Sequence, residues 1–237
     1  MIDTHCHLLP QLDDGPSNED EALALARGLA RLGVFAIVCT PHYSRRYPTS
    51  HEAAREQLGR LEHRLRGAGV SIALSLAAEI SPGYAVSQPG EELKRRSFGG
   101  RFVLVELLPD TPAVFLETAL EHMLPLGLKP VFAHPERCPA LQNAPRLLSD
   151  AREGGALVQI VASSLAGRWG STIAMAAWGL LDAGAIDLLA SDSHSPRSTA
   201  SLQRAVELVR DRYGADALED LVERRPAQML KSPPQQV

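Results

Sequence analysis

The sequence predicts an α/β protein, most simply a distorted seven-stranded (β/α) barrel of the TIM-like kind. Seven short apolar runs recur along the chain, and helix-like segments lie between most of them. Near-continuous apolar runs suit strands that are buried on both faces, as in a parallel sheet. Six of the seven runs also end in His, Glu or Asp. Strands that alternate with helices favour a barrel, and an open doubly wound sheet is the weaker alternative.

The predicted strands and helices follow one another along the chain. The apolar runs cover residues 1–7, 34–40, 71–79, 102–107, 129–134, 156–163 and 186–194. The helix-like segments cover residues 17–33, 51–67, 112–126, 143–153, 171–183 and 199–213. The clearest helix, "SNEDEALALARGLARLG", has Ser17 as its N-cap candidate, acidic residues in its first turn and Gly33 at its end.

Length and composition limit the class of protein. With 237 residues and 45% hydrophobic content, we expect one domain over residues 1–230 and a disordered tail over residues 231–237. A formal charge of -4 and a pI near 6.1 do not favour strong electrostatic binding to nucleic acid or membrane surfaces. Neither a membrane span nor a secretory signal is evident. Three cysteines without C-x-x-C spacing indicate a reduced, cytoplasmic location.

Titratable side chains gather where the apolar runs end. The residues at these ends are His5, His7, His42, Glu79, Glu106, His134, Asp192 and His194. In an α/β barrel the carboxyl ends of the strands form one face, and that face carries the chemistry. A carboxylate or imidazole in such a place is costly to bury unless it is paired or binds a metal. His51, His63 and His122 lie in polar helical patterns, where we expect solvent exposure.

The types of side chain narrow the choice of metal and reaction. Imidazole and carboxylate without thiolate suit Mn, Fe or Zn, and do not suit Fe–S clusters or Cu(I). Asp14, in "LDDGPS", brings the number of candidate ligands to nine. A single catalytic zinc takes about three protein ligands, so nine candidates imply two or three divalent ions. Such clusters favour hydrolysis of a phosphate ester, because neighbouring ions stabilise both the attacking and the leaving oxygen.

The segment from Cys39 to Arg45 contains a pattern that is typical of a different class of phosphatase. Cys39 and Arg45 have the C-x5-R spacing of cysteine-dependent tyrosine phosphatases. That chemistry needs converging backbone N–H groups, yet Pro41 removes one of them and the segment has no glycine. We therefore expect Cys39 to be a small buried strand residue and Cys138 to have no chemical role. Cys6 is expected to point away from His5 and His7, because side chains alternate along a strand.

The motifs "DTHCH", "DDGP", "TPH", "AEI", "AHPER" and "SDSH", in this order, resemble the PHP (polymerase and histidinol phosphatase) superfamily. Within it, "DDGP" together with "HPER" is similar to the bacterial protein-tyrosine phosphatases of capsular and exopolysaccharide biosynthesis. The resemblance extends from Met1 to about Met229. It implies a PHP-type barrel with three ions, often Mn²⁺, at the carboxyl ends of the strands. It also implies a substrate: the phosphorylated, tyrosine-rich tail of the bacterial tyrosine autokinase that controls polysaccharide export.

The resemblance also implies roles for individual residues. His5, His7, Glu79 and Asp192 would hold one ion. Glu79, Glu106 and His134 would hold the second, with Glu79 bridging, and Asp14, His42 and His194 would hold the third. Arg137 matches the arginine that binds phosphate, and Arg197, in a shorter loop, is the nearest candidate for a second one. Asp14, His42, His194 and Arg137 are the residues expected to act in catalysis.

The expected mechanism is in-line attack of an activated water on phosphorus. The planar guanidinium of Arg137 suits the non-bridging oxygens, because it presents paired donors. A tyrosyl leaving group has a pKa of ~10 and needs little help from a general acid. For Asp13 a turn-forming role is favoured over a supporting role in the site. Ser163 and Ser164 either contact substrate or cap the following loop.

Two other functions are weighed against this one. A PHP phosphoesterase for a small molecule, such as histidinol phosphate or a nucleotide, would use a similar set of ligands. A non-catalytic PHP domain that binds a kinase or polymerase partner is disfavoured, because the candidate ligand set is intact. A nuclease has little support in an acidic chain without a basic aromatic stripe. The sequence does not indicate an oligomeric state.

Overall fold

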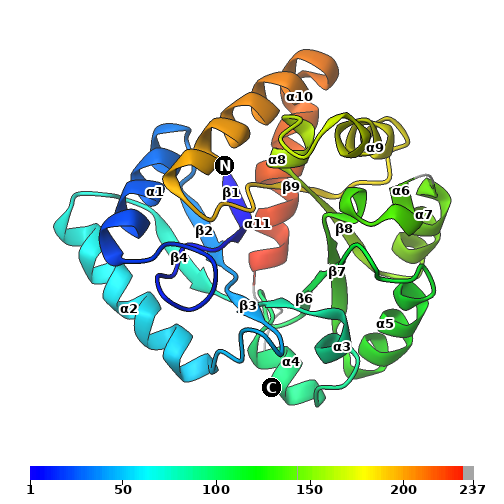
Figure 1. Ribbon diagram of the computed structural model, residues 1–237, viewed down its shortest axis with the longest axis horizontal. Coiled ribbons are helices and arrows are strands. Elements are labelled where there is room, and N and C mark those ends of the chain that lie inside the picture. The colour runs from blue at the N-terminus through cyan, green and yellow to red at the C-terminus, as the bar shows by residue number, and fades with distance from the viewer. Residues whose placement is uncertain (143, 232–237) are drawn as a thin grey trace.

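Each of the seven apolar runs contains a strand in the computed structural model, which describes residues 1–142 and 144–231. Two further short strands follow, β3 (His42–Tyr43) just after the second run and β5 (Glu79–Ile80) from the last residue of the third, so the described residues form nine strands in all (Figure 1). Every pairing between them is parallel. The strands are β1 Ile2–Cys6, β2 Ala36–Cys39, β3 His42–Tyr43, β4 Ala73–Leu76, β5 Glu79–Ile80, β6 Phe102–Glu106, β7 Lys129–Ala133, β8 Leu157–Val161 and β9 Leu188–Ala190.

The strands form two sheets rather than the single closed barrel that the sequence predicts. One sheet has the order β1-β2-β4 and the other has the order β3-β5-β6-β7-β8-β9. The ladder breaks between β2 and β3 at Pro41, which has no N–H to donate. At the other seam, Cys6 of β1 forms an isolated parallel bridge with Ser193, three residues after β9. The prediction of a parallel α/β architecture is thus confirmed, whereas a closed seven-stranded barrel is not found among the described residues.

The predicted helices are present, with short additional ones in the loops. The α-helices are α1 Glu19–Arg31, α2 His51–Gly67, α3 Pro82–Ala85, α4 Gly90–Arg95, α5 Phe115–Met123, α6 Pro139–Gln142, α7 Pro145–Glu153, α8 Ala162–Leu165, α9 Ser171–Asp182, α10 Thr199–Glu219 and α11 Arg225–Leu230. Short 3₁₀ turns cover Leu124–Leu126, Pro135–Arg137 and Pro196–Ser198, and a π-helical turn covers Asp220–Arg224.

The first helix begins one residue later than predicted. Its N-cap is Asn18, whose side chain accepts a hydrogen bond from the backbone N–H of Glu21 at 2.9 Å. Ser17 lies outside the helix and donates from its backbone N–H and its hydroxyl to the Glu21 carboxylate. The prediction of Ser17 as N-cap is therefore wrong, because Asn18 has the extended backbone and the acceptor that this position needs. Gly33 ends the helix at a φ of 87°, as expected.

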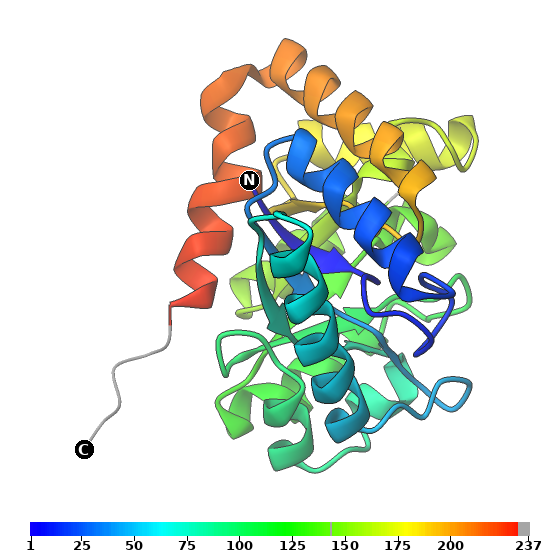
Figure 2. The ribbon, with the colours of Figure 1, turned by 90° about the vertical axis from the view of Figure 1, so that its left-hand side faces the viewer.

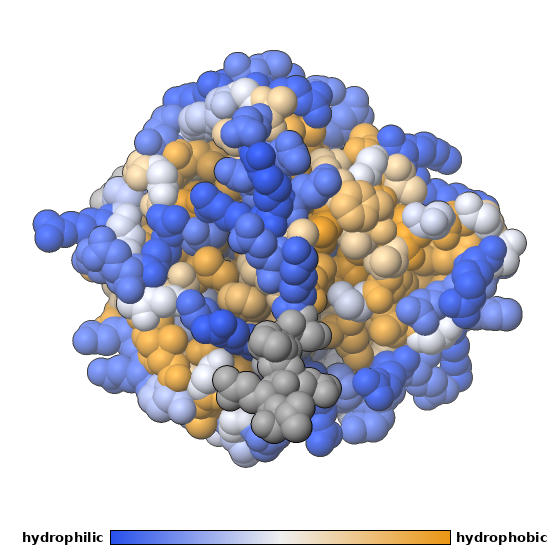
Figure 3. Space-filling model, turned by 180° about the vertical axis from the view of Figure 1, so that it is seen from behind, coloured by the Kyte–Doolittle hydropathy of each residue, from blue (hydrophilic) through white to orange (hydrophobic). Residues whose placement is uncertain are grey.

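The carboxyl-terminal helix α11 covers the end of the sheets that is opposite to the strand carboxyl ends, and α10 runs along the side of the molecule against α8 and α1. Figure 2 shows α10 and α11 turning past β1, away from the loops that follow β1 and β3. Met229 of α11 packs with Phe98, Val38 and Leu104 in the smaller of two hydrophobic clusters. Seen from this side, hydrophilic residues form a band between two hydrophobic areas (Figure 3). One end of the sheets is therefore covered by helix, and the end formed by the strand carboxyl ends is open to a functional site.

Two remaining expectations concern the ends and the surface. Of the predicted disordered tail, residues 232–237 lie outside the described residues, and Lys231 is exposed. Within residues 1–142 and 144–231, none of the helices combines the length and the hydropathy that crossing a membrane requires.

Gly99 and Gly100 give a matched test of the contact between α11 and the sheets. Both have positive φ, at 61° and 66°, but a Cβ on Gly99 would overlap the carbonyl oxygen of Met229, whereas one on Gly100 meets no atom within 4 Å. We expect Gly100→Ala to cost about 1 kcal/mol of unfolding free energy, and Gly99→Ala to cost about 3 kcal/mol because the overlap adds to the strain. Thermal unfolding should show midpoints lowered by roughly 2 to 4 °C and roughly 6 to 12 °C. Equal midpoints for the two variants would contradict this packing.

Candidate metal centre

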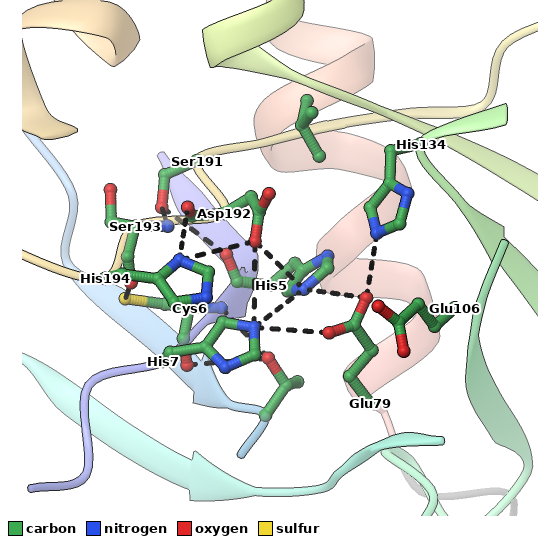
Figure 4. Close-up of polar contacts among 12 residues, drawn as sticks. His5, Cys6, His7, Glu79, Glu106, His134, Ser191, Asp192, Ser193 and His194 are labelled. Carbon is green, nitrogen blue, oxygen red and sulfur yellow. Dashed lines mark hydrogen bonds and ion pairs between the residues drawn. The ribbon is translucent and has the colours of Figure 1, made fainter. Parts of the chain in front are cut away.

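All nine predicted ligands converge at the carboxyl ends of the strands (Figure 4 shows most of them). Parallel strands bring their ends to one edge, which is why residues almost 190 positions apart in the chain can meet here. The nine residues are His5 on β1, His7 and Asp14 after β1, His42 on β3, Glu79 on β5, Glu106 at the end of β6, His134 after β7, and Asp192 and His194 after β9.

His5 and His7 form the buried floor of this cluster. Their Nε2 atoms lie 3.2 Å apart. The two oxygens of Glu79 lie 3.4 and 3.3 Å from these nitrogens, and one oxygen of Asp192 lies 3.4 and 3.6 Å from them. Cys6 points away from the cluster into the core, as the alternation along a strand predicts. Two imidazoles and two carboxylates therefore face one another with solvent excluded.

Glu79 is the central carboxylate. His134 Nε2 lies 2.9 Å from one of its oxygens, and His42 Nδ1 lies 3.0 Å from the other. The β3–β5 pairing places His42 and Glu79 directly opposite one another, which fixes this contact. Glu106 extends the group, with one oxygen 3.9 Å from His42 Nδ1. Glu79 thus joins the floor to the histidines beside it.

Asp14, His42 and His194 form the outer rim. The Asp14 carboxylate lies 3.5 Å from His42 Nε2 and 3.3 Å from His194 Nε2. The His194 ring stacks on His7 with centroids 3.9 Å apart. Half of the Asp14 side chain is exposed, and hydrogen bonding to His194 lowers its pKa to about 2. The rim therefore carries an ionised carboxylate at the mouth of the site.

Three groups have ligand atoms close enough to share an ion, each with all its atoms within 4.8 Å of one another. The prediction placed His134 with Glu79 and Glu106; by distance the second group holds His42 with these two carboxylates, while His134 Nε2 lies 2.9 Å from Glu79. The assignment of ligands to individual ions stays a prediction. His7 belongs to two groups, which the sequence did not indicate. The groups are His5, His7 and Asp192; His42, Glu79 and Glu106; and His7, Asp14, His42 and His194.

Residues behind the cluster fix how the imidazoles are oriented. His5 Nδ1 lies 2.8 Å from the amide oxygen of Gln159, and His7 Nδ1 lies 2.7 Å from a carboxylate oxygen of Asp13. Each imidazole therefore donates its Nδ1–H outward and turns Nε2 toward the centre. Asp13 also accepts from the Gly15 N–H, so it forms the predicted turn and supports the site at once. Gln159 was missed, although a lone amide inside "ALVQIVAS" is a signal that a buried partner is required.

This arrangement fits divalent cations. With both Nδ1 atoms donating, the facing Nε2 lone pairs of His5 and His7 repel each other unless a proton or a metal lies between them. Burial would lower the pKa of His5, but attraction to Glu79 and Asp192 outweighs it and raises the pKa. Burial would raise the pKa of Glu79, but the charge of His5 and the hydrogen bond from His134 keep it well below its usual range. The cluster therefore favours positive charge at its centre.

Backbone geometry at the site is also unusual. His134 and Asp192 have φ values of 41° and 51°, in the left-handed region that residues other than glycine rarely adopt. His134 directly follows β7 and Asp192 lies two residues after β9, and both turn their side chains toward the cluster. Strain of this kind persists where the surrounding structure enforces it, and it is common in functional sites.

A cavity of about 410 Å³ lies above the cluster, and Arg137 lines it. Arg137 donates to Asp192 at 2.8 Å and to Ser163 at 2.9 Å, and these two contacts hold its guanidinium at the cavity. Its guanidinium carbon lies 4.8 Å from the centre of the Trp169 ring, which is 54% exposed. Trp169 was not predicted, because an exposed loop residue has no periodic pattern to mark it.

The second predicted arginine is not part of this cavity. Arg197 is exposed in the 3₁₀ turn before α10 and does not line it, whereas Arg168, beside Trp169, does. The role of Arg197 in substrate binding stays a prediction. Ser163 lies at the cavity and bonds to Arg137, while Ser164 is buried behind it.

The cysteines take no part in the site. Cys6, Cys39 and Cys138 are free and buried. Burial raises the pKa of the Cys39 thiol well above its usual range, so the thiolate that a cysteine phosphatase needs is disfavoured. The geometry thus agrees with rejecting the C-x5-R pattern.

Gln159→Leu should test how far orientation of His5 matters. Leucine leaves the His5 Nδ1–H without an acceptor in a buried place, and we expect metal affinity to fall about 10- to 100-fold. The matched variant Gln159→Glu keeps an acceptor and should retain most of the affinity. Titration of each variant with Mn²⁺ and competing chelator measures the difference. If leucine and glutamate variants bind metal equally, Gln159 does not position His5.

Comparison with known proteins agrees with this geometry. Residues 1–231 match the family described as capsular polysaccharide synthesis, CpsB/CapC. The tyrosine-protein phosphatase YwqE of Bacillus subtilis is 30% identical, over 100% of this chain and 96% of its own length. The tyrosine-protein phosphatase CpsB of Streptococcus pneumoniae is 27% identical, over 97% and 98%. A crystal structure from work on YwqE and CpsB, described as metal-dependent tyrosine phosphatases, superposes with a TM-score of 0.83 at 27% identity, over 98% of this chain and 96% of that one.

Proposed function

The chain belongs to the CpsB/CapC family of capsular polysaccharide synthesis, and from this premise we propose that it is a metal-dependent protein-tyrosine phosphatase. The observation that carries the proposal is the convergence of nine imidazole and carboxylate ligands beneath a cavity with an arginine in its wall. Relatives that bear the name tyrosine-protein phosphatase span nearly the whole chain. Phosphotyrosine in protein is accordingly the proposed substrate.

We propose two or three divalent ions, with Mn²⁺ first and Fe or Zn as alternatives. Imidazole and carboxylate donors without thiolate support these metals. Ions bound here would lower the pKa of a water molecule from ~15.7 to ~7 and stabilise the charge that develops on the phosphoryl oxygens. The residues that would hold them are His5, His7, Asp14, His42, Glu79, Glu106, His134, Asp192 and His194.

The side chains of the protein would orient the ester and its leaving group. Arg137 is held by Asp192 and Ser163 at the cavity wall, where its planar donors can bind two phosphoryl oxygens. Asp14 stays ionised because its pKa is about 2, so it accepts hydrogen bonds and does not serve as a general acid. A tyrosyl oxygen, with a pKa of ~10, leaves without strong protonation.

The finer parts of the proposal concern setting and architecture. We propose that residues 1–230 form one PHP-type domain, in which seven strand positions give a distorted barrel around the site. The protein would act in the cytoplasm, which the three free cysteines support. Its partner would be a bacterial tyrosine autokinase that regulates capsule or exopolysaccharide synthesis; of this, the family's description supports the connection to capsular polysaccharide synthesis. No contact with nucleic acid and no membrane insertion are proposed.

The direct test is phosphate release by the full chain loaded with Mn²⁺. We expect turnover of a phosphotyrosine peptide that chelation abolishes and added Mn²⁺ restores. Histidinol phosphate and nucleoside monophosphates serve as controls for the small-molecule alternative. Faster turnover of either control would favour that alternative, and a protein that binds no metal would favour the non-catalytic one.

Metal affinity should depend on pH in a defined direction. Hydrogen bonds and charge attraction from neighbouring carboxylates raise the pKa values of His5, His7 and His42 against the opposing effect of burial. A raised pKa makes protons stronger competitors of a cation for these imidazoles, so metal affinity should fall as pH decreases from about 8 to about 6. Calorimetry in two buffers of different ionisation enthalpy should detect proton release. Constant affinity over this range would contradict the expectation.

A further inference from the structure

A second cavity, of about 620 Å³, opens beside the first and shares Asp14, His42 and Glu106 with it. We call this cavity the flanking groove. One side is the segment after β3, residues 44–47, and the other side is formed by the start of α3 and the loop after β6. Because the two cavities meet at the rim of the metal centre, a chain bound with its phosphate at the centre can continue into the groove.

Arg45 and Arg46 stand at the tip of a held hairpin along this groove. The Ser44 N–H donates to the Tyr47 carbonyl at 3.1 Å, and the Tyr47 N–H donates to the Ser44 hydroxyl at 3.2 Å. The Tyr47 ring lies parallel to His42, with centroids 5.4 Å apart. The loop between β3 and α2 projects from the same face as the loop after β1 (Figure 2), and Thr49 bonds to that loop. The tip is thus fixed to the site.

The charges of the groove are unequal between its two sides. Arg45 and Arg46 are exposed, and in the part of the chain that the structure describes neither takes part in an ion pair. Asp110 is the acidic residue of the opposite side. Asp14 and Glu106 face the metal centre, where bound cations would offset their charge. The groove therefore has a local excess of positive charge at residues 45 and 46. The proposed phosphatase reaction assigns no role to these two arginines.

We propose that the flanking groove binds the peptide segment next to the phosphotyrosine, and that Arg45 and Arg46 select substrates with an anionic side chain there. This inference rests on the proposed function, and it adds a substrate class to it. A carboxylate or a second phosphate on the peptide would meet the two guanidinium groups. The Tyr47 ring, held against His42, forms the surface between the metal centre and this anion subsite.

Reciprocal charge reversal tests the proposal on the Mn²⁺-loaded full chain. Peptides identical except for glutamate, serine or lysine beside the phosphotyrosine are compared, together with p-nitrophenyl phosphate. The wild type should turn over the glutamate peptide with kcat/KM about 10-fold above the lysine peptide, mainly through KM. Arg45→Glu/Arg46→Glu should invert this order and leave p-nitrophenyl phosphate unchanged. Arg27→Glu/Arg210→Glu, which alters two exposed arginines outside the groove, should keep the wild-type order.

A milder variant, a change of salt concentration and a second phosphopeptide extend this experiment. The milder variant Arg45→Ala/Arg46→Ala should remove the preference without inverting it, and salt raised from about 50 to about 500 mM should weaken the preference of the wild type. A peptide with a second phosphotyrosine in place of glutamate shows which anion is preferred, and either preference supports the subsite. Equal kcat/KM for all peptides, with p-nitrophenyl phosphate hydrolysed, would overturn the subsite but leave the phosphatase intact. No hydrolysis of any phosphotyrosine substrate would overturn both.

Discussion

Glu79→Gln is expected to lower kcat/KM at least ~10³-fold, equivalent to about 4 kcal/mol of transition-state stabilisation. Glu79 contacts four imidazoles, those of His5, His7, His42 and His134. Glutamine keeps the shape but removes the charge and one acceptor oxygen. Because Glu79 links the floor of the cluster to the histidines beside it, metal should be lost from more than one position. Elemental analysis alongside phosphotyrosine-peptide kinetics measures both effects on the same sample.

A second buried glutamate provides the control for this substitution. Glu136 lies two residues after His134, is fully buried and accepts from the Val161 N–H. Burial raises the pKa of its carboxyl group, and the amide of Glu136→Gln keeps the size and shape of the side chain. We expect this variant to keep its metal and to retain kcat/KM within about threefold, because the hydrogen bond to Val161 survives. Full activity in a metal-depleted Glu79→Gln protein would refute the metal-dependent scheme.

How much of the site could be predicted depends on how local each signal is. His5, His42, Glu79 and His134 were found because each ends an apolar run, and parallel strands bring their ends to one edge whatever the details of the fold. The pairing of ligands into groups could not be found in this way. His42 rather than His134 groups with Glu106, because the pairing of β3 with β5 places His42 directly opposite Glu79. Which strands become neighbours is a property of the folded chain that no single apolar run specifies.

The residues that orient the histidines were also hard to predict, because their partners are set by the folded chain. Gln159 and Asp13 matter because of what lies opposite them across the fold, at separations of 154 and 6 residues from the histidines they orient. A polar residue in an apolar run signals that a partner exists, but it does not identify the partner. Trp169 and Arg168 lie in the loop after α8, where no periodicity acts, so only the folded chain brings them to the cavity. Arg197 shows the converse: proximity in sequence to His194 did not place it there.

Arg137→Ala should have the second large effect, lowering kcat/KM about 10²- to 10³-fold with bound metal retained. The side chain has no role among the ligand groups, but its Nη2 atom lies at the cavity beside Asp192. Removing it takes away paired donors from the phosphoryl group. Inhibition by inorganic phosphate should weaken in parallel, because that anion would use the same donors.

Arg137→Lys separates charge from geometry. Lysine keeps a positive charge but cannot form the planar, two-donor contact, nor can it both stack on Trp169 and reach Asp192 and Ser163 in the same way. We expect kcat/KM to recover at most about 10-fold relative to the alanine variant.

The metal content of the alanine variant decides the cause of any loss of activity. If the alanine variant loses its metal along with its activity, Arg137 acts by holding Asp192, and the phosphate contact is not its main contribution. If metal is retained while phosphate inhibition weakens, the arginine binds the substrate itself, and the pair with Asp192 serves to aim it.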